Sequence, residues 1–109
     1  MTNPLDDALH YAAAHREQFL EQLCEYLSIP SISAQPDHAR DIKYAALWLA
    51  DHLRALGLRA EIYETGTESA PGHPIVFAEW QHADPHRPTL LVYGHYDVQP
   101  PDPLDDWIS

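Results

Sequence analysis

The chain has 109 residues, 45% of them hydrophobic and 21% charged, which is enough apolar material for the core of one small domain. Its 17 acidic and 6 basic residues give a formal net charge of -11, which argues against nucleic acid or an anionic membrane as a partner. No apolar run approaches the roughly 20 residues of a membrane span. Because Cys24 is the only cysteine and no signal-peptide pattern is present, we expect a cytoplasmic protein.

The first expected element is an amphipathic helix from about residue 4 to residue 28. Asn3 is a suitable N-cap and Pro4 a suitable first helical residue, and acidic residues follow in the first turn. Cys24 belongs to the predicted apolar stripe, so we expect it to be a buried structural thiol. The stripe consists of Phe19, Leu20, Leu23, Cys24 and Leu27.

A second helix is expected over residues 38–56. Asp37 is a plausible N-cap, and Gly57 stands where a left-handed residue ends many helices. Trp48 is expected to pack beside the apolar face of this helix. That face consists of Ile42, Ala45, Ala46, Leu49, Leu53 and Leu56.

Three strands are expected after the helices. Residues 58–63 alternate between apolar and polar side chains, whereas residues 75–78 and 90–93 are continuously apolar. The connecting loops are too short for crossover helices, so local antiparallel pairing is possible. The order of the elements predicts an α/β fold in which two N-terminal helices pack on a mixed sheet.

The segment after Tyr93 is expected to be an irregular loop that carries the chemistry. It is rich in proline and in acidic residues and histidine, and it follows the strand predicted to be the most buried. His95 and Asp97 are two residues apart, so in an extended chain they project to the same side. Both side chains could bind one metal ion, or His95 could bind while Asp97 orients its ring.

The longer string around this pair resembles the first metal motif of a known enzyme family. Residues 90–107 read LLVYGHYDVQPPDPLDDW, and they closely resemble carnosinase-like dipeptidases, whose wider family includes aminoacylases and succinyl-diaminopimelate desuccinylases. The segment from Gly72 to Trp80 and the Ser-Ile-Pro-Ser-Ile-Ser run ending at Ser33 also look like this family. The resemblance covers nearly the whole chain.

The resemblance implies that residues 1–109 are the truncated N-terminal portion of a zinc-peptidase catalytic domain. It assigns His95 as a ligand of one of two zinc ions, with manganese or cobalt as possible substitutes. Asp97 would belong to the catalytic machinery as the acid that holds His95. The family hydrolyses dipeptides or other small amides with a metal-activated water, and its members often dimerise through a part absent here. The family's remaining ligands and its general-base glutamate lie beyond Ser109, so the chain alone is expected to be inactive.

Two other functions fit the sequence. The complete protein could hydrolyse N-acyl amino acids, which are substrates of the same wider family. The chain could also be a non-catalytic acidic α/β module that binds a partner protein.

Overall fold

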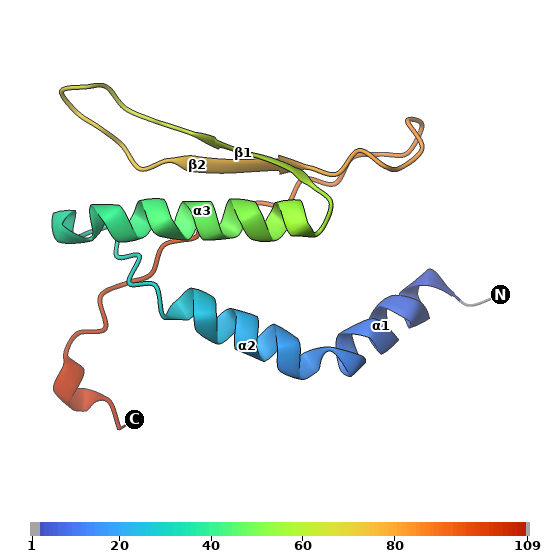
Figure 1. The fold of residues 1–109 in the computed structure, drawn as a ribbon, viewed down its shortest axis with the longest axis horizontal. Helices are drawn as coiled ribbons and strands as arrows, with labels where there is room; N and C mark the ends of the chain where they lie inside the picture. The colour runs from blue at the N-terminus through green and yellow to red at the C-terminus, as the bar shows by residue number, and fades with distance from the viewer. Residues whose placement is uncertain (1–2, 109) are drawn as a thin grey trace.

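The computed structural model describes residues 3–108, and its elements form a hairpin, a helix beneath it and an extended helical arm (Figure 1). No helix in this part of the chain has the length and apolarity that a bilayer crossing needs. In chain order the elements are α1 (Pro4–Ala14), α2 (Arg16–Leu27), the 3-10 turn η1 (Pro36–His38), α3 (Ala39–Ala55), β1 (Arg59–Tyr63), β2 (Ile75–Glu79) and the 3-10 turn η2 (Leu104–Asp106).

The single N-terminal helix predicted from the sequence is in fact two helices that meet at His15. The predicted start is confirmed, because the Asn3 side chain accepts a hydrogen bond from the Leu5 backbone at 3.1 Å and Pro4 occupies the first turn. At the break, His15 leaves helical geometry with φ of -109° and ψ of 16°. Its Nδ1 lies 2.9 Å from the Tyr11 carbonyl oxygen, and its ring stacks on the Tyr11 ring. The backbone N–H of His15 still donates to the Tyr11 carbonyl at 3.0 Å and its own carbonyl accepts from Phe19, so the break is confined to one residue.

Helix α3 matches its predicted bounds to within one residue at each end, although the predicted N-cap is wrong. His38 is the N-cap residue and makes no capping side-chain hydrogen bond, while Asp37 lies inside η1. His38 is held instead by Asp41, whose carboxylate oxygen is 2.7 Å from its Nδ1. At the other end Gly57 has the predicted left-handed conformation, with φ of 94°.

The hairpin β1–β2 lies along α3, and the small core is at this contact. The two strands pair antiparallel, with Glu61 opposite Phe77, which confirms these two strands and their local pairing. The buried residues of α3 are mostly alanines, whose small side chains allow close packing. The buried apolar residues are Ile29, Ile32, Ile42, Ala45, Ala46, Ala50 and Ala60. Of the predicted α3 face, Leu49 and Leu53 are half-buried and Leu56 is exposed.

The third predicted strand is absent from the described residues, so the prediction of a mixed sheet is wrong. The only sheet there has two antiparallel strands, and residues 90–93 are extended but unpaired. Leu90 remains 85% exposed and Tyr93 93% exposed, so this segment is not the most buried strand. An apolar run of this kind becomes a strand only where a neighbouring strand supplies hydrogen bonds, and no such neighbour is present in residues 3–108.

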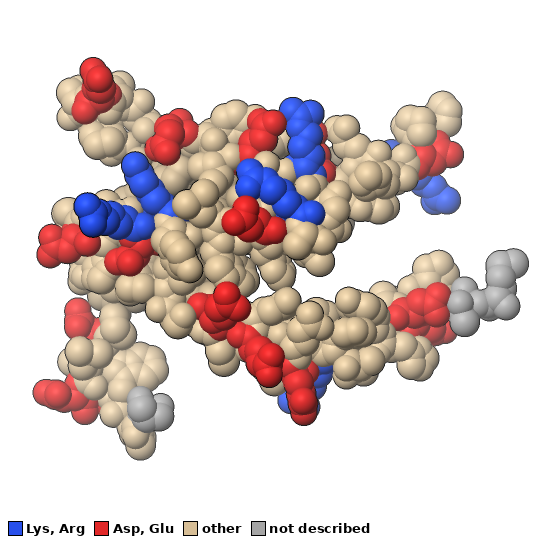
Figure 2. Space-filling model, in the orientation of Figure 1, with Lys and Arg blue, Asp and Glu red and all other residues tan. Residues whose placement is uncertain are grey.

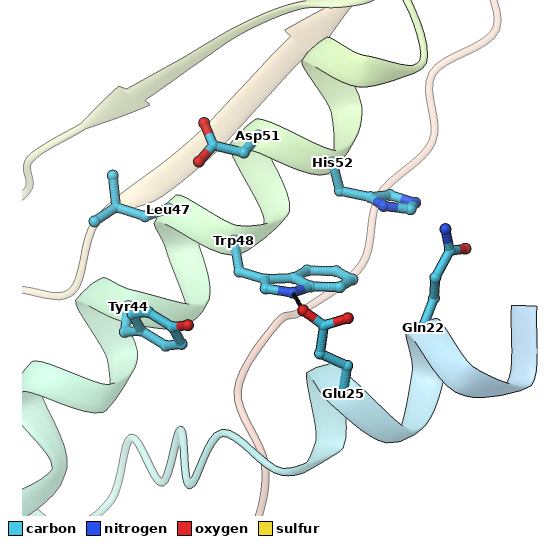
Figure 3. A pocket seen from close by; sticks show the side chains of 7 residues that line it. All are labelled: Gln22, Glu25, Tyr44, Leu47, Trp48, Asp51 and His52. Carbon is cyan, nitrogen blue, oxygen red and sulfur yellow. Dashed lines mark hydrogen bonds between the residues drawn. The ribbon is translucent and has the colours of Figure 1, made fainter. Parts of the chain in front are cut away.

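The expected packing of both N-terminal helices on the sheet is also wrong. In the described part of the chain, α3 is the helix that packs on the hairpin, and α2 meets the opposite side of α3 (Figure 1). Trp48 of α3 donates its indole N–H to the Glu25 carboxylate of α2 at 3.0 Å, as Figure 3 shows. The stripe predicted to be buried in the first helix is exposed, Cys24 included. Nothing in residues 3–108 covers that side of α2.

Candidate metal-binding site around His95 and Asp97

The structure brings His95 and Asp97 together as the sequence predicts. The Nδ1 atom of His95 lies 2.8 Å from Oδ1 of Asp97, which is hydrogen-bonding distance. The His95 side chain is 82% exposed, and its Nε2 has no hydrogen-bond partner among residues 3–108. An imidazole whose Nδ1–H points at a carboxylate presents the Nε2 lone pair outward, which is the arrangement that a metal-binding histidine needs.

The second oxygen of Asp97 is held from the other side by Ser33. The Ser33 hydroxyl donates a hydrogen bond to Oδ2 of Asp97, 64 residues later in the chain. This bond is the main reason that the pKa of Asp97 lies below its usual value, and the contact with His95 lowers it further, while partial burial opposes both with a smaller effect than that of Ser33. Asp97 is therefore a carboxylate at neutral pH and accepts hydrogen bonds with both oxygens.

Backbone contacts fix the loop that carries the pair. The amide of Val98 donates to the carbonyl of Ser31 at 2.9 Å, and Ile32 and Val98 form an isolated parallel bridge. On the neighbouring residue, the carbonyl of Tyr96 accepts hydrogen bonds from the hydroxyls of Tyr26 and Ser31. These contacts attach an otherwise irregular loop to the buried segment that follows α2.

The described residues offer one candidate histidine ligand and no complete metal site. Within residues 3–108, no three His, Cys, Asp or Glu side chains lie close enough together to hold a metal ion. His95 alone nevertheless fits the role of one ligand, because its ring is oriented by Asp97 and its Nε2 is accessible. Catalytic zinc takes about three protein ligands, so further ligands would have to come from outside this set.

Other surface features do not point to a second site of the same kind. A hollow of about 490 Å³ lies between α2 and α3, and its lining includes neither His95 nor Asp97 (Figure 3). Acidic side chains are scattered over several elements in the view of Figure 2 and do not gather at one place. The hollow is lined by Gln22, Glu25, Tyr44, Leu47, Trp48, Asp51 and His52.

Comparison with known proteins relates almost the entire chain to dipeptidases. A mouse protein named Beta-Ala-His dipeptidase is 36% identical over 113 aligned residues, which cover 96% of this chain and 23% of the mouse protein. The Cys-Gly metallodipeptidase of Candida albicans is 35% identical over 84% of this chain and 20% of its own length. Almost the entire chain is thus similar to one part of these dipeptidases. No family model matches the chain.

A solved dipeptidase structure contains the same fold. The dipeptidase from Saccharomyces cerevisiae, solved for its substrate recognition, superposes on the whole chain with a TM-score of 0.87 at 24% identity. The chain covers 24% of that structure and about a quarter or less of the length of the curated relatives it matches. The arrangement of helices and hairpin is thus that of one part of a larger metallodipeptidase fold.

Sequence reasoning missed the residues that hold the pair in place. Ser33, Tyr26 and His73 contact the loop or its anchor from positions more than 20 residues away. The Ser-Ile-Pro-Ser-Ile-Ser run contains Ser33 and resembles the family. This resemblance was the one feature of the sequence that could have pointed to Ser33. The run does not indicate which hydroxyl faces Asp97, because that depends on how the segment lies beside the loop.

Proposed function

We propose that the chain is part of a metal-dependent dipeptidase in which His95 binds zinc through Nε2. The observation that carries the proposal is the 2.8 Å contact between His95 Nδ1 and Asp97 Oδ1. In this arrangement Asp97 selects the tautomer with the proton on Nδ1 and raises the basicity of the ring, which strengthens a bond from Nε2 to a metal ion. The relatives named above as dipeptidases support the same conclusion.

The described residues account for the positioning of one metal ligand and not for the complete hydrolysis reaction. When bound, zinc would activate the water that attacks the amide bond of the substrate. His95 would hold the metal, and Asp97 would hold His95. The two-metal centre implied by the family resemblance needs more ligands than residues 3–108 bring together, so residues outside this range would supply the remaining ligands.

The substrate class follows from the relatives. We infer a dipeptide, because the similar proteins are named for Beta-Ala-His and Cys-Gly dipeptides. A cytoplasmic location belongs to the same proposal and rests on the sequence features given above. The dimer expected from the family resemblance rests on that resemblance alone.

Zinc binding to the 109-residue chain tests the metal role. In isothermal titration calorimetry we expect weak binding that His95→Ala abolishes. We expect Asp97→Ala to weaken it by about tenfold, since loss of a carboxylate that orients a histidine ligand costs about 10–100-fold in metal affinity. His86→Ala is the matched control, because His86 is also exposed but lies in a different loop.

Two results would contradict this proposal. Binding that is unchanged by His95→Ala would remove the metal role from this residue. Tight binding together with dipeptide hydrolysis by the 109-residue chain would show that the site is already complete, against the ligand count above.

A further inference from the structure

Residues 31–33 lie against residues 96–98 and supply hydrogen bonds to both the backbone and the side chains of that loop. Ser31 is only 1% exposed, and its carbonyl accepts from the Val98 amide at 2.9 Å. Ile32, which is 6% exposed, bridges to Val98 in parallel. Two buried residues thus bring the next residue, Ser33, to a fixed position beside Asp97.

The Asp97 carboxylate is shared between an exposed ring and an anchored hydroxyl. Ser33 donates to Oδ2, and the half-buried Ser33 is itself held, since His73 Nε2 lies 3.1 Å from its carbonyl oxygen. On the other oxygen, His95 is 82% exposed, and within residues 3–108 the only hydrogen-bond partner of its ring is Asp97. Ser33 is therefore the fixed end of this series of hydrogen bonds, and His95 is the mobile end.

The terminal torsion of an aspartate is broad and roughly two-fold, so a single hydrogen bond from a mobile partner leaves the carboxylate plane poorly defined. A second hydrogen bond from an anchored hydroxyl restricts that rotation. Hydrogen bonds to ionised acceptors are also stronger than those between neutral groups. Nδ1 of His95 also lies 3.2 Å from the backbone carbonyl of Asp97, so Asp97 offers it two acceptors, and the one that can rotate is held by the Ser33 hydroxyl.

We propose that Ser33 is a positioning residue for His95. Its hydroxyl fixes the plane of the Asp97 carboxylate, and the carboxylate in turn holds the proton of His95 on Nδ1 and leaves Nε2 as the open nitrogen. This inference rests on the proposed function, because positioning His95 matters only if His95 binds a metal ion. The arrangement of hydroxyl, carboxylate and imidazole can nevertheless be measured without metal.

The tautomer of His95 in the metal-free chain is the direct measurement. Nitrogen-15 NMR of the imidazole, at a pH where the ring is neutral, should show the Nδ1-protonated form as the main tautomer. Ser33→Ala should shift His95 toward the Nε2-protonated form and lower its zinc affinity by about tenfold, as loss of a group that orients a histidine ligand does. Ser33→Thr keeps the hydroxyl and should restore both properties.

Ser28→Ala is the matched control. The Ser28 hydroxyl donates to the Glu25 carbonyl at 2.6 Å and has no connection to Asp97, so removing it should leave the His95 tautomer unchanged. Circular dichroism on each variant checks that the helices persist. If Ser33→Ala fails to fold, Ser33→Cys provides the weaker donor, and we then expect an intermediate tautomer ratio.

The outcomes separate this inference from the proposed function. A His95 tautomer that ignores Ser33→Ala, or that Ser33→Thr fails to restore, would overturn the positioning role even if His95 binds zinc. A tautomer that follows the Ser33 substitutions would support the positioning role, even if calorimetry shows that zinc does not bind His95.

Discussion

At the scale of single residues, two half-buried tyrosines show how distant parts of the chain meet at the site. The Tyr26 hydroxyl donates to the carbonyl of Tyr96, 70 residues later, and the Tyr96 hydroxyl donates to the carbonyl of Pro74. Partial burial is the main reason that the pKa of each phenol is raised. The stability that goes with these raised values is present below roughly pH 10, the usual value for tyrosine, and is lost as the pH rises through the raised pKa.

Removal of the Tyr26 hydroxyl should loosen the loop that carries His95. We expect Tyr26→Phe to lower the free energy of unfolding by about 1 kcal/mol, the usual net value of one intramolecular hydrogen bond. Urea denaturation followed by circular dichroism measures this change. Tyr63→Phe is the control, because the Tyr63 hydroxyl bonds to Glu61, two residues earlier on the same strand, and not to a distant segment. Equal stability of the two variants would contradict an anchoring role for Tyr26.

At the scale of elements, the end of α3 decides where β1 begins. The amide of Gly57 donates to the carbonyl of Arg54 at 2.9 Å, and the amide of Leu58 donates to the carbonyl of Leu53 at 3.1 Å. These two hydrogen bonds together form the Schellman motif, which needs a left-handed residue at the position of Gly57. The chain then turns directly into β1, which lies back along α3.

Because Gly57 is in the left-handed conformation, we expect its substitution to lower the free energy of unfolding. Gly57→Ala should destabilise the chain by about 1–2 kcal/mol, because the left-handed region is strained for a residue with a Cβ. A methyl group at this position would meet only open space, so no steric clash would add to this value. Thermal or urea unfolding measures the effect.

Gly94→Ala is the comparison for this substitution. Gly94 also has open space around it, and its φ is not in the left-handed region. We therefore expect Gly94→Ala to be neutral or slightly stabilising through the unfolded state. Similar losses at both glycines would show that the conformation of Gly57 is not the cause.

At the scale of the whole molecule, the chain is extended and leaves much apolar surface in water. Its radius of gyration is 17.4 Å and its dimensions are 52 × 41 × 19 Å. A compact domain of this size would have a radius of gyration of about 13 Å. The apolar run at residues 90–93 and the stripe on α2 are both exposed. Such surfaces, and an unpaired extended segment in particular, favour self-association.

A charge placed in the exposed run should reduce that association. We expect Leu91→Lys to lower the fraction of oligomer measured by analytical ultracentrifugation over a range of concentrations, since Leu91 is 84% exposed and carries no core contact to lose. Thr67→Lys makes the same change of charge in a polar loop and is the control. If both variants reduce oligomers equally, net charge and not the apolar run controls association.

Local sequence patterns were sufficient for the elements whose ends and faces depend on neighbouring residues. The Asn3 cap, the extent of α3, the left-handed Gly57 and the antiparallel pairing of the two strands all depend on residues close in sequence. The proximity of His95 and Asp97 is of the same kind, because residues two apart in an extended chain share a side.

Only the tertiary structure decided which apolar faces are covered and what holds the site. The stripe of α2 and the run at residues 90–93 have the composition of buried elements, yet burial requires a partner surface that lies far away in sequence or outside the described residues. The contact of Ser33 with Asp97 likewise joins positions 64 residues apart. The sequence indicated the resemblance to dipeptidases and the candidate pair of site residues. The structure decided how that pair is held, because long-range contacts depend on the path of the whole chain.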